Sequence, residues 1–258
     1  MLIAQLTDLH VTTPDRRSLG GADPIRRALA AARWLRALET PPDLVLLTGD
    51  NVQRGDAAEY AELLRVFADL PFRVLALPGN HDARDPLRAA AAPLGWVPAD
   101  GDFLHQALTL DGLRVVLLDS LDPGNIGGRL CDARLDWLAE QLESRRGAPV
   151  LLALHHPPFD CGIEGLDAHG LQGRERLAEL AAGHGGVVAA LSGHLHRALA
   201  CWWAGTCAFS APSAGRQFAL SLAPGAEPDW SDDPPAAALH WWRPDRGLVS
   251  HVVNIPQD

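Results

Sequence analysis

Short apolar runs recur along the chain, and each is followed within a few residues by Asp, Asn or His. The runs span residues 2–6, 43–47, 72–77, 150–154 and 186–191. Continuous apolar runs of this length are typical of strands buried on both faces of a sheet. Polar residues just beyond the carboxyl ends of such strands meet along one edge of an open α/β sheet. The pattern therefore predicts one sheet with a cluster of Asp, Asn and His at its edge.

Amphipathic stretches fill most of the intervals between these strands. Asp23-Pro24 supplies an N-cap and a proline at the first helical position, and this helix is expected to reach about Glu39 before Pro41-Pro42 ends it. Further helices are predicted over about 56–69, 84–91, 132–146 and 171–183. Alternation of strands and helices indicates an α/β fold with a largely parallel sheet.

The remaining strands are predicted as pairs joined by turns. These pairs are 102–110 with 113–119, 197–203 with 206–211, and 237–243 with 247–253. Asp111-Gly112 is a hairpin turn signal between the first two. We expect the antiparallel pairs to form a second sheet packed on the first, within a single domain over residues 1–258. Residues 223–235, rich in Pro, Asp and Gly, are predicted to be a loop.

Composition narrows the class of protein. The chain has 258 residues, 47% of them hydrophobic, and no apolar run long enough for a transmembrane helix. Met1 leads almost directly into the first strand, which leaves no room for a signal peptide and predicts a cytoplasmic protein with no membrane partner. A net charge of −10 argues against a nucleic-acid duplex as partner. The chain contains no Lys, which excludes Schiff-base chemistry and a P-loop lysine.

The cysteines show no metal-binding or redox spacing. They are Cys131, Cys161, Cys201 and Cys207. In a cytoplasmic protein, buried free thiols are the favoured interpretation. Cys201 and Cys207 flank a predicted turn at 204–206, so a bridge between paired strands remains the alternative.

The residues that follow the five apolar runs form a set of candidate metal ligands. They are Asp8, His10, Asp50, Asn80, His155, His194 and His196. On a regular strand the members of Asp8-x-His10, and of His194-x-His196, share a face, and at a strand end both members can reach one ion. Glycine precedes both Asp50 and Asn80, where it permits a sharp turn and a close backbone approach.

The composition of this set indicates the metal and the reaction. Four His, two Asp and one Asn without sulfur suit Fe, Mn, Zn or Co rather than Mg or Ca. Seven ligands exceed the need of one ion and fit two divalent ions that share a carboxylate. Two metal ions about 3.5–4 Å apart suit hydrolysis of phosphate esters. Two such ions, two aspartates and a hydroxide leave a charge of about +1, which complements a monoanionic diester.

The complete motif set resembles that of the calcineurin-like metallophosphoesterases over about residues 1–215. The motifs are Asp8-x-His10, Gly49-Asp50, Gly79-Asn80-His81-Asp82, His155 and Gly193-His194-x-His196. The unbroken Gly-Asn-His-Asp, the segment His155-His156-Pro157-Pro158 and the chain length are most similar to bacterial class III cyclic-nucleotide phosphodiesterases and glycerophosphodiesterases.

The resemblance implies roles for the residues and a fold. One ion would be held by Asp8, His10, Asp50 and His196, and the other by Asp50, Asn80, His155 and His194. His81 would be catalytic: it would face the substrate and stabilise or protonate the leaving oxygen. The implied fold is a four-layer α/β/β/α sandwich of two mixed sheets flanked by helices.

The leading hypothesis is a bimetallic phosphodiesterase that hydrolyses a small diester, a 3′,5′-cyclic nucleotide or a glycerophosphodiester, by a metal-activated hydroxide. A phosphomonoesterase of the same fold is the first alternative, and a non-catalytic phosphoesterase scaffold that binds proteins is the second. The Trp-rich C-terminal hairpins predict a homo-oligomer, a dimer or larger.

Several nearby residues have open roles. Asn51 is expected to hydrogen-bond the metal loop. Whether Asp82 orients the ring of His81 is left open. The side chain of His156 is expected to point away from that of its neighbour His155. The other histidines are expected at the surface or in the core: His105, His169, His184, His240 and His251. Core or subunit packing is expected for the pairs Trp202-Trp203 and Trp241-Trp242. Solvated positions are expected for Arg16, Arg17 and Arg54, although each follows a metal loop.

Overall fold

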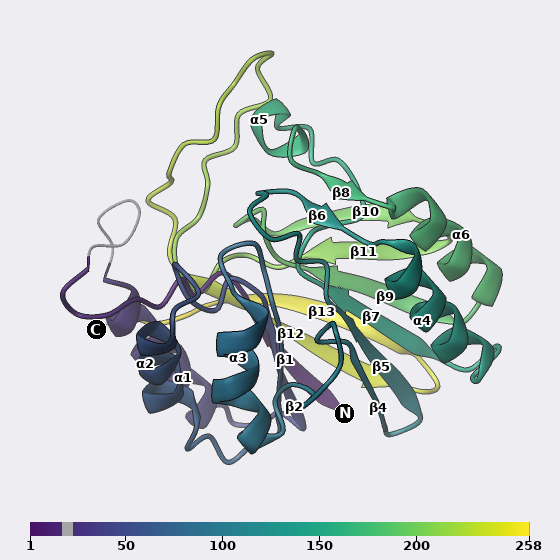
Figure 1. The fold of residues 1–258 in the computed structure, drawn as a ribbon, viewed down its shortest axis with the longest axis horizontal. Coiled ribbons are helices and arrows are strands. Elements are labelled where there is room, and N and C mark those ends of the chain that lie inside the picture. Colours follow the sequence, from purple (N-terminus) through teal and green to yellow (C-terminus); the bar gives the residue numbers. More distant parts are fainter. Residues whose placement is uncertain (17–22, 258) are drawn as a thin grey trace.

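The computed structural model describes residues 1–16 and 23–257. Two mixed sheets are stacked, and helices cover their outer faces (Figure 1). The first sheet has the order β13-β12-β1-β2-β3, and the second has the order β10-β11-β9-β7-β5-β4. The predicted α/β fold of two mixed sheets flanked by helices is confirmed.

The strand bounds are as follows. The first sheet contains β1 (Leu2–Leu6), β2 (Leu44–Thr48), β3 (Val74–Leu77), β12 (Ala236–Arg243) and β13 (Gly247–Asn254). The second contains β4 (Gln106–Leu110), β5 (Leu113–Leu118), β7 (Val150–Leu154), β9 (Val187–Ser192), β10 (Leu199–Trp203) and β11 (Thr206–Ser210). A small separate sheet pairs β6 (Gly128–Arg129) with β8 (Leu171–Gln172).

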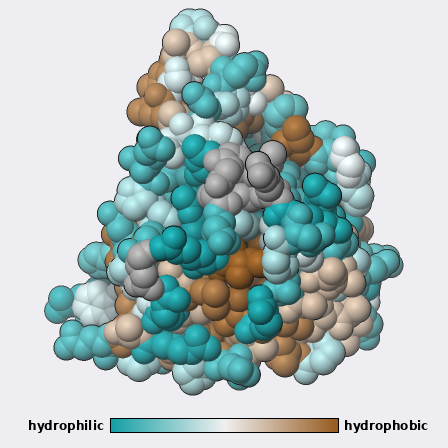
Figure 2. All heavy atoms as spheres, turned by 90° about the vertical axis from the view of Figure 1, so that its left-hand side faces the viewer, coloured by the Kyte–Doolittle hydropathy of each residue, from teal (hydrophilic) through white to brown (hydrophobic). Residues whose placement is uncertain are grey.

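The helices divide between the two outer faces. Those on the first sheet are α1 (Pro24–Arg36), α2 (Ala57–Phe67) and α3 (Arg84–Ala91), followed by the 3-10 turn η2 (Ala92–Leu94). Those on the second are α4 (Asp132–Glu143) and α6 (Arg174–His184), and α5 (Glu164–Asp167) lies apart above the sheet edges (Figure 1). On the α1–α3 side, hydrophilic side chains surround a hydrophobic area near the centre of the view (Figure 2).

Three apolar clusters separate the four layers. One joins the first sheet to α1, α2 and α3, with Tyr60 and Phe67 among its fully buried members. A second joins the other sheet to α4 and α6. The third lies between the sheets and includes Ile3, Leu46 and Leu151. Strands buried on both faces explain the continuous apolar runs of the sequence, since each run must contact a helix layer and the opposite sheet.

The hairpins do not form the second sheet by themselves, so that expectation is wrong. β12 and β13 extend the first sheet, where β12 is antiparallel to β1. The hairpins β4-β5 and β10-β11 flank β7 and β9, which run parallel to their neighbours in the second sheet. The five apolar runs are therefore divided between the two sheets. Each sheet has a parallel centre that is covered on both faces, and such strands need continuous apolar runs.

Helix boundaries differ from the prediction where local geometry intervenes. Asp23 caps α1 as expected, since its carboxylate accepts a hydrogen bond from Arg26 N at 3.0 Å. The helix ends at Arg36 rather than near Glu39. Residues 171–172 are a strand rather than the start of a helix, because Gly173 has φ 85° and separates β8 from α6.

The thiols and tryptophans are only partly buried. All four cysteines are free, as favoured, but Cys207 is exposed and the other three are half-buried. Cys207 faces Trp202 across the β10-β11 pair rather than Cys201. Neighbouring residues on a strand point to opposite faces, so each Trp pair divides. Trp203 and Trp242 pack in the cores, whereas Trp202 is 79% exposed and Trp241 is 41% exposed, contrary to core packing.

Buried polar side chains form a continuous series of hydrogen bonds across the first sheet, starting at the β12-β13 hairpin. His240 on β12 is fully buried between Ser250 Oγ, at 2.7 Å from its Nδ1, and Gln5 Oε1, at 3.0 Å from its Nε2. Gln5 in turn donates to Thr48 Oγ1 and to the carbonyl of Ser192. Burial and the nearby His251 lower the pKa of His240 to about 3. The folded protein therefore holds this imidazole neutral.

Lowering the pH from 7 to 5 is expected to cost about 2 kcal/mol of unfolding free energy through His240, because only the unfolded residue takes up a proton there. Since the folded pKa is depressed, this contribution is constant above the ordinary value of 6.5 and falls until the pH reaches about 3. Denaturant unfolding of the wild type and His240→Gln at both pH values measures it. His251→Gln, exposed on β13, is the matched control. Equal pH dependence in all three proteins would contradict the expectation.

Candidate metal centre

The predicted ligands lie together where strands of both sheets end. Asp8 and His10 follow β1, and Asp50 and Asn80 follow β2 and β3 of the same sheet. His155 follows β7, and His194 and His196 follow β9, in the other sheet. The expectation of a single sheet edge is therefore wrong. Two stacked sheets point the carboxyl ends of these five strands into one place, and the site lies between them.

One group of ligand atoms joins Asp8, His10 and His196, which all lie within 4.8 Å of one another. His10 Nε2 is 3.2 Å from His196 Nε2, and His196 Nε2 is 3.4 Å from Asp8 Oδ1. The Nδ1 of His196 donates to the carbonyl of Arg216 at 2.6 Å. This hydrogen bond fixes the tautomer and turns Nε2 toward the site.

A second group joins Asp50, Asn80, His155 and His194. His155 Nε2 is 3.5 Å from Asp50 Oδ1 and 3.2 Å from Asn80 Oδ1, and His194 Nδ1 is 3.1 Å from the same amide oxygen. The Nδ1 of His155 donates to the carbonyl of Thr48 at 2.9 Å, which again leaves Nε2 for the site. Asp50 also approaches the first group, since its Oδ2 is 3.7 Å from His10 Nε2.

The charges of the site suit divalent cations. Burial opposes ionisation of Asp8 and Asp50, yet His196 holds the pKa of Asp8 at about 2 and His155 holds that of Asp50 well below its usual value. Burial lowers the pKa of His10 and His194 to about 3. Ionised carboxylates and neutral imidazoles are the forms that bind metal.

Two imidazoles behave differently. Against the effect of burial, Asp50 and Asp8 raise the pKa of His155 to about 9, and Asp8 raises the pKa of His196. A proton on either ring occupies the place that a divalent ion would take. Metal binding at these residues therefore competes with protons and weakens as the pH falls.

The nitrogens that face the site support the fit to metal ions. The facing Nε2 atoms of His10 and His196 are two basic nitrogens at hydrogen-bond distance, which a cation between them stabilises. Carboxylate, imidazole and amide oxygen donors in this number match two divalent ions.

The backbone of the ligands is strained. Seven described residues other than glycine have positive φ, and five of them are Asp8 (53°), His10 (47°), Asp50 (49°), His194 (70°) and His196 (48°). Left-handed conformations are unfavourable for such residues and concentrate at functional sites. Asp8 and His10 therefore lie beyond the regular strand and do not share a strand face. The strand ends at Leu6, and two left-handed residues aim the side chains.

Glycines let the ligand loops approach one another. A Cβ added to Gly79 would lie 2.2 Å from Asp50 Oδ1 and 2.8 Å from His155 Cε1. A Cβ added to Gly193 would lie 1.9 Å from Thr7 Oγ1. Real Cβ atoms do not approach heavy atoms so closely, so these two positions require glycine.

Gly79→Ala is expected to displace Asp50 or His155 and to lower metal content and turnover at least about tenfold, because a 1 Å misplacement costs about 100-fold in an active site. Elemental analysis and a diester assay measure both. Gly183→Ala is the matched control, since a Cβ there meets nothing within 4 Å on α6. Full metal content and turnover in Gly79→Ala would contradict the close packing described.

Asp82 supports the metal loops rather than His81. Its carboxylate accepts hydrogen bonds from Gly79 N, from the backbone and side-chain nitrogens of Asn51, and from the Tyr60 hydroxyl. Asn51 also donates to the carbonyl of Leu77, so it does bond the metal loop as expected. Burial and the charge of Asp50 raise the pKa of Asp82 to about 6. Sequence reasoning missed Tyr60, whose position in α2 carries only a helical apolar signal.

His81 is held by the backbone of Gln53 instead. Its Nδ1 donates to the Gln53 carbonyl at 2.8 Å, and its backbone N–H donates to Asp50 Oδ1 at 2.9 Å. The ring lies edge-on to His10, with centroids 4.7 Å apart. Because Nδ1 is engaged, Nε2 is the nitrogen left for a substrate.

His156 lies beside the centre but has both ring nitrogens occupied. Nδ1 is 2.8 Å from Ser120 Oγ, and Nε2 donates to the carbonyl of Ile126 at 3.1 Å. Burial lowers its pKa well below the usual value. His156 therefore anchors the loop that carries Ile126 instead of adding a ligand.

A cavity of about 120 Å³ opens above the ligands. Its inner part is lined by His10, Asp50, Asn80, His81, His194 and His196, and its outer part by Ile126, Leu166, His169, Phe218 and Trp230. These outer residues were missed, and His169 was expected to have no part in the site. Leu166 lies in α5 and His169 just after it, Phe218 and Trp230 lie before and in the predicted loop 223–235, and Ile126 lies in the loop before β6. The segment around α5 and the loop 223–235 rise together in Figure 1. Only the fold brings them over the ligands.

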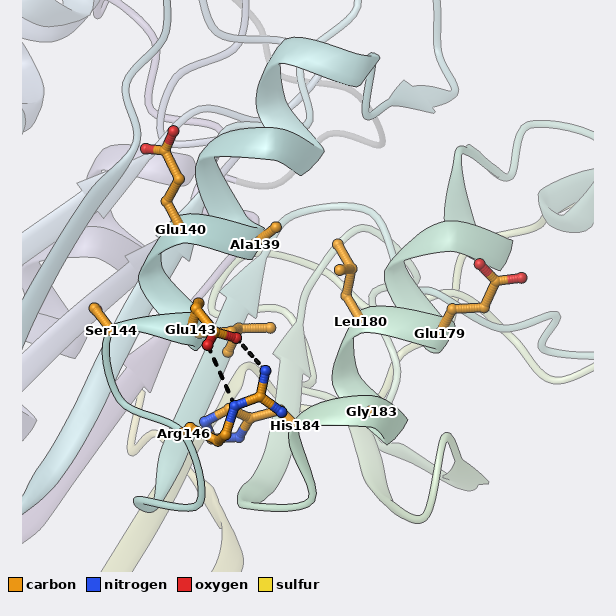
Figure 3. A pocket seen from close by; sticks show the side chains of 10 residues that line it. Ala139, Glu140, Glu143, Ser144, Arg146, Glu179, Leu180, Gly183 and His184 are labelled. Carbon is orange, nitrogen blue, oxygen red and sulfur yellow. Dashed lines mark hydrogen bonds and ion pairs between the residues drawn. The ribbon is translucent and has the colours of Figure 1, made fainter.

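The other candidate histidines and arginines lie elsewhere. His105 stacks on Trp137, His184 donates to the carbonyl of Arg145, and His251 is exposed. Arg16 pairs with Asp56 and Glu59, and Arg17 lies outside the described residues. A larger cavity of about 870 Å³ lies between α4 and α6, where Glu143 pairs with Arg146, and no candidate ligand lines it (Figure 3).

Comparison with known proteins agrees with this geometry. The model of the calcineurin-like phosphoesterase family matches residues 1–198, so the chain belongs to that family. A probable glycerophosphodiester phosphodiesterase GpdQ of Arcobacter nitrofigilis is 33% identical over 99% of this chain and 93% of its own. A probable cyclic nucleotide phosphodiesterase of Synechococcus is 34% identical over 93% and 91%.

Two further comparisons extend this picture. The 3′,5′-cyclic adenosine monophosphate phosphodiesterase CpdA of Pseudomonas aeruginosa is 30% identical over 94% of this chain and 85% of its own. A dimetal phosphatase from Danio rerio, 15% identical, shares the fold with a TM-score of 0.68 over 99% of both chains. No described helix of this chain is long and apolar enough to cross a membrane.

Proposed function

We propose that the chain hydrolyses small phosphate diesters, a 3′,5′-cyclic nucleotide or a glycerophosphodiester, with two divalent ions of Fe, Mn, Zn or Co. The observation that carries this proposal is the convergence of seven oxygen and nitrogen donors, five of which line one cavity together with His81. The names of the similar proteins support diesters over monoesters.

Each of the two donor groups would hold one ion. Asp8, His10 and His196 would hold one ion, and Asn80, His155 and His194 would hold the other, with Asp50 between them. Bound divalent ions supply Lewis acidity: they polarise phosphoryl oxygens and lower the pKa of water. Thr48 and Arg216 carbonyls keep the rings of His155 and His196 in the required orientation.

His81 completes the site on the substrate side. Gln53 and Asp50 hold it so that Nε2 is free, and a protonated ring donates from Nε2 to the departing alkoxide oxygen. Neutralising that oxygen matters most for alkyl esters, whose alkoxides are poor leaving groups.

Metal removal and reconstitution test the proposal. Chelator-treated protein is expected to lose turnover of bis(p-nitrophenyl) phosphate and to regain it with Mn. The ratio of diester to monoester turnover should exceed one across a panel with 3′,5′-cyclic AMP, glycerophosphoethanolamine and p-nitrophenyl phosphate. A preference for the monoester would favour a phosphomonoesterase, and inactivity with every ion would favour a non-catalytic scaffold.

We also propose the setting in which the chain acts. Four free thiols support a reducing compartment such as the cytoplasm. The cluster between the sheets supports one domain over residues 1–258. Exposed Trp202 and Trp241, with Val249 and Val252 on the edge strand β13, support a homo-oligomer. A monomeric mass by light scattering at micromolar concentration would reject the oligomer.

A further inference from the structure

The outer wall of the cavity carries little charge. Ile126, Leu166, Phe218 and Trp230 are apolar or aromatic, and His169 is the one polar group among the outer lining residues. A polyhydroxyl headgroup that extends from the metal centre on this side meets neither a carboxylate nor an amide among the outer lining residues. A flat apolar group meets surfaces of its own kind.

Two aromatic rings form one side of this wall. Phe218 stacks on Trp230 with centroids 4.5 Å apart and planes 25° apart, and Phe218 lies 4.7 Å from the ring of His196. The guanidinium of Arg216 lies 5.1 Å from the Trp230 ring. The pair therefore extends directly from a metal-ligand candidate toward the mouth of the cavity. We call Phe218 and Trp230 the aromatic wall.

The backbone holds the aromatic wall in place. Phe218 and Trp230 face each other in an isolated antiparallel bridge. Ala219 N donates to the Asp229 carbonyl at 2.7 Å, and Ser231 N donates to the Gln217 carbonyl at 3.0 Å. The arm beyond is tied to α5, because Gly225 N donates to Glu164 Oε2 at 2.7 Å. A preorganised aromatic surface loses little entropy when it binds a planar ligand.

We propose that the aromatic wall is the stacking surface for the base of a nucleoside 3′,5′-cyclic monophosphate, and that His169 faces the polar edge of that base. This inference rests on the proposed function, from whose two substrate classes it selects the nucleoside. Stacking on aromatic side chains tolerates any base, because every base has a π-face. Selection therefore acts between nucleosides and headgroups more than between purines and pyrimidines.

Kinetics with two diesters test the aromatic wall. For each variant, kcat/KM is measured with Mn for 3′,5′-cyclic AMP and for glycerophosphoglycerol, whose headgroup has no base and no ammonium group that an aromatic ring could attract. Trp230→Ala is expected to lower the ratio of the two values at least about tenfold, and Trp230→Phe less than about threefold, because a smaller ring still stacks. Trp202→Ala, which removes an exposed tryptophan from β10, should leave the ratio unchanged.

Inhibition separates base binding from the metal centre. In Trp230→Ala, the inhibition constant of AMP should rise at least about tenfold relative to that of inorganic phosphate, which has no base. If Trp230→Ala loses metal or fold, Trp230→Leu replaces it, since leucine keeps apolar volume without a π-face, and the same ratios decide.

The outcomes distinguish this inference from the proposed function. Absence of turnover with every diester and ion overturns the proposed function itself. Diester turnover with unchanged ratios in Trp230→Ala and Trp230→Leu, or a wild-type preference for glycerophosphoglycerol, overturns the aromatic wall alone. A parallel loss on both diesters assigns Trp230 a structural role and also overturns it.

Discussion

Asp50→Asn is expected to lower diester turnover about a thousandfold, because a shared metal ligand supports several kcal/mol of transition-state stabilisation. Asp50 lies between the two donor groups, 3.7 Å from His10 Nε2 and 3.5 Å from His155 Nε2. Asparagine keeps the size and one oxygen but removes the charge that the two cations would share. Elemental analysis should show a loss of metal together with the loss of activity.

A matched variant separates this effect from a general change in charge. Asp85→Asn removes a carboxylate that is 96% exposed at the start of α3. It should keep full metal content and turnover. If Asp50→Asn binds both ions and remains active, Asp50 is not the shared ligand, and the division of donors proposed above falls.

His81→Ala is expected to lower kcat about 100- to 10,000-fold, the usual contribution of a general acid, while metal content stays full. The size of the loss in kcat should depend on the leaving group of the substrate. Esters of p-nitrophenol leave without help, so bis(p-nitrophenyl) phosphate should lose much less than glycerophosphoethanolamine. Paired assays on the two substrates, with metal analysis, measure the difference.

A second histidine provides the control for this variant. His169→Ala removes an exposed imidazole at the outer wall, so it should not produce the same dependence on the leaving group. Equal losses on good and poor leaving groups in His81→Ala would assign His81 to substrate positioning. Loss of metal in His81→Ala would instead place it among the ligands.

Much of the candidate centre could be predicted because its residues follow buried strands. The apolar runs can be recognised in the sequence alone, and the fold brings together the residues that follow β1, β2, β3, β7 and β9. The number and type of donors then suggest two ions without any coordinates. The predicted positions of these residues needed only the rule that ligands gather at the carboxyl ends of strands.

The rest of the fold and of the site depends on geometry that the pattern of apolar and polar residues does not encode. Apolar periodicity shows that a strand is covered on both faces, but not whether a helix or a second sheet covers it. The left-handed backbones of Asp8 and His10 have no compositional signal, since neither residue is glycine. Trp230 reaches the cavity by stacking on Phe218, and His169 by a turn whose backbone N–H donates to the carbonyl of Leu166, so tertiary contacts rather than local propensity place them there.

The placement of the donors on both sheets has a mechanical consequence. Each proposed ion would bind residues from the β1-β2-β3 sheet and from the β7-β9 sheet, so it would cross-link the two halves of the sandwich at one end. A ligand that binds only the native state slows and disfavours separation of the parts it joins. The loaded protein should therefore open first at the opposite end, where the β4-β5 turn at Asp111 contacts the N-terminus and Trp242.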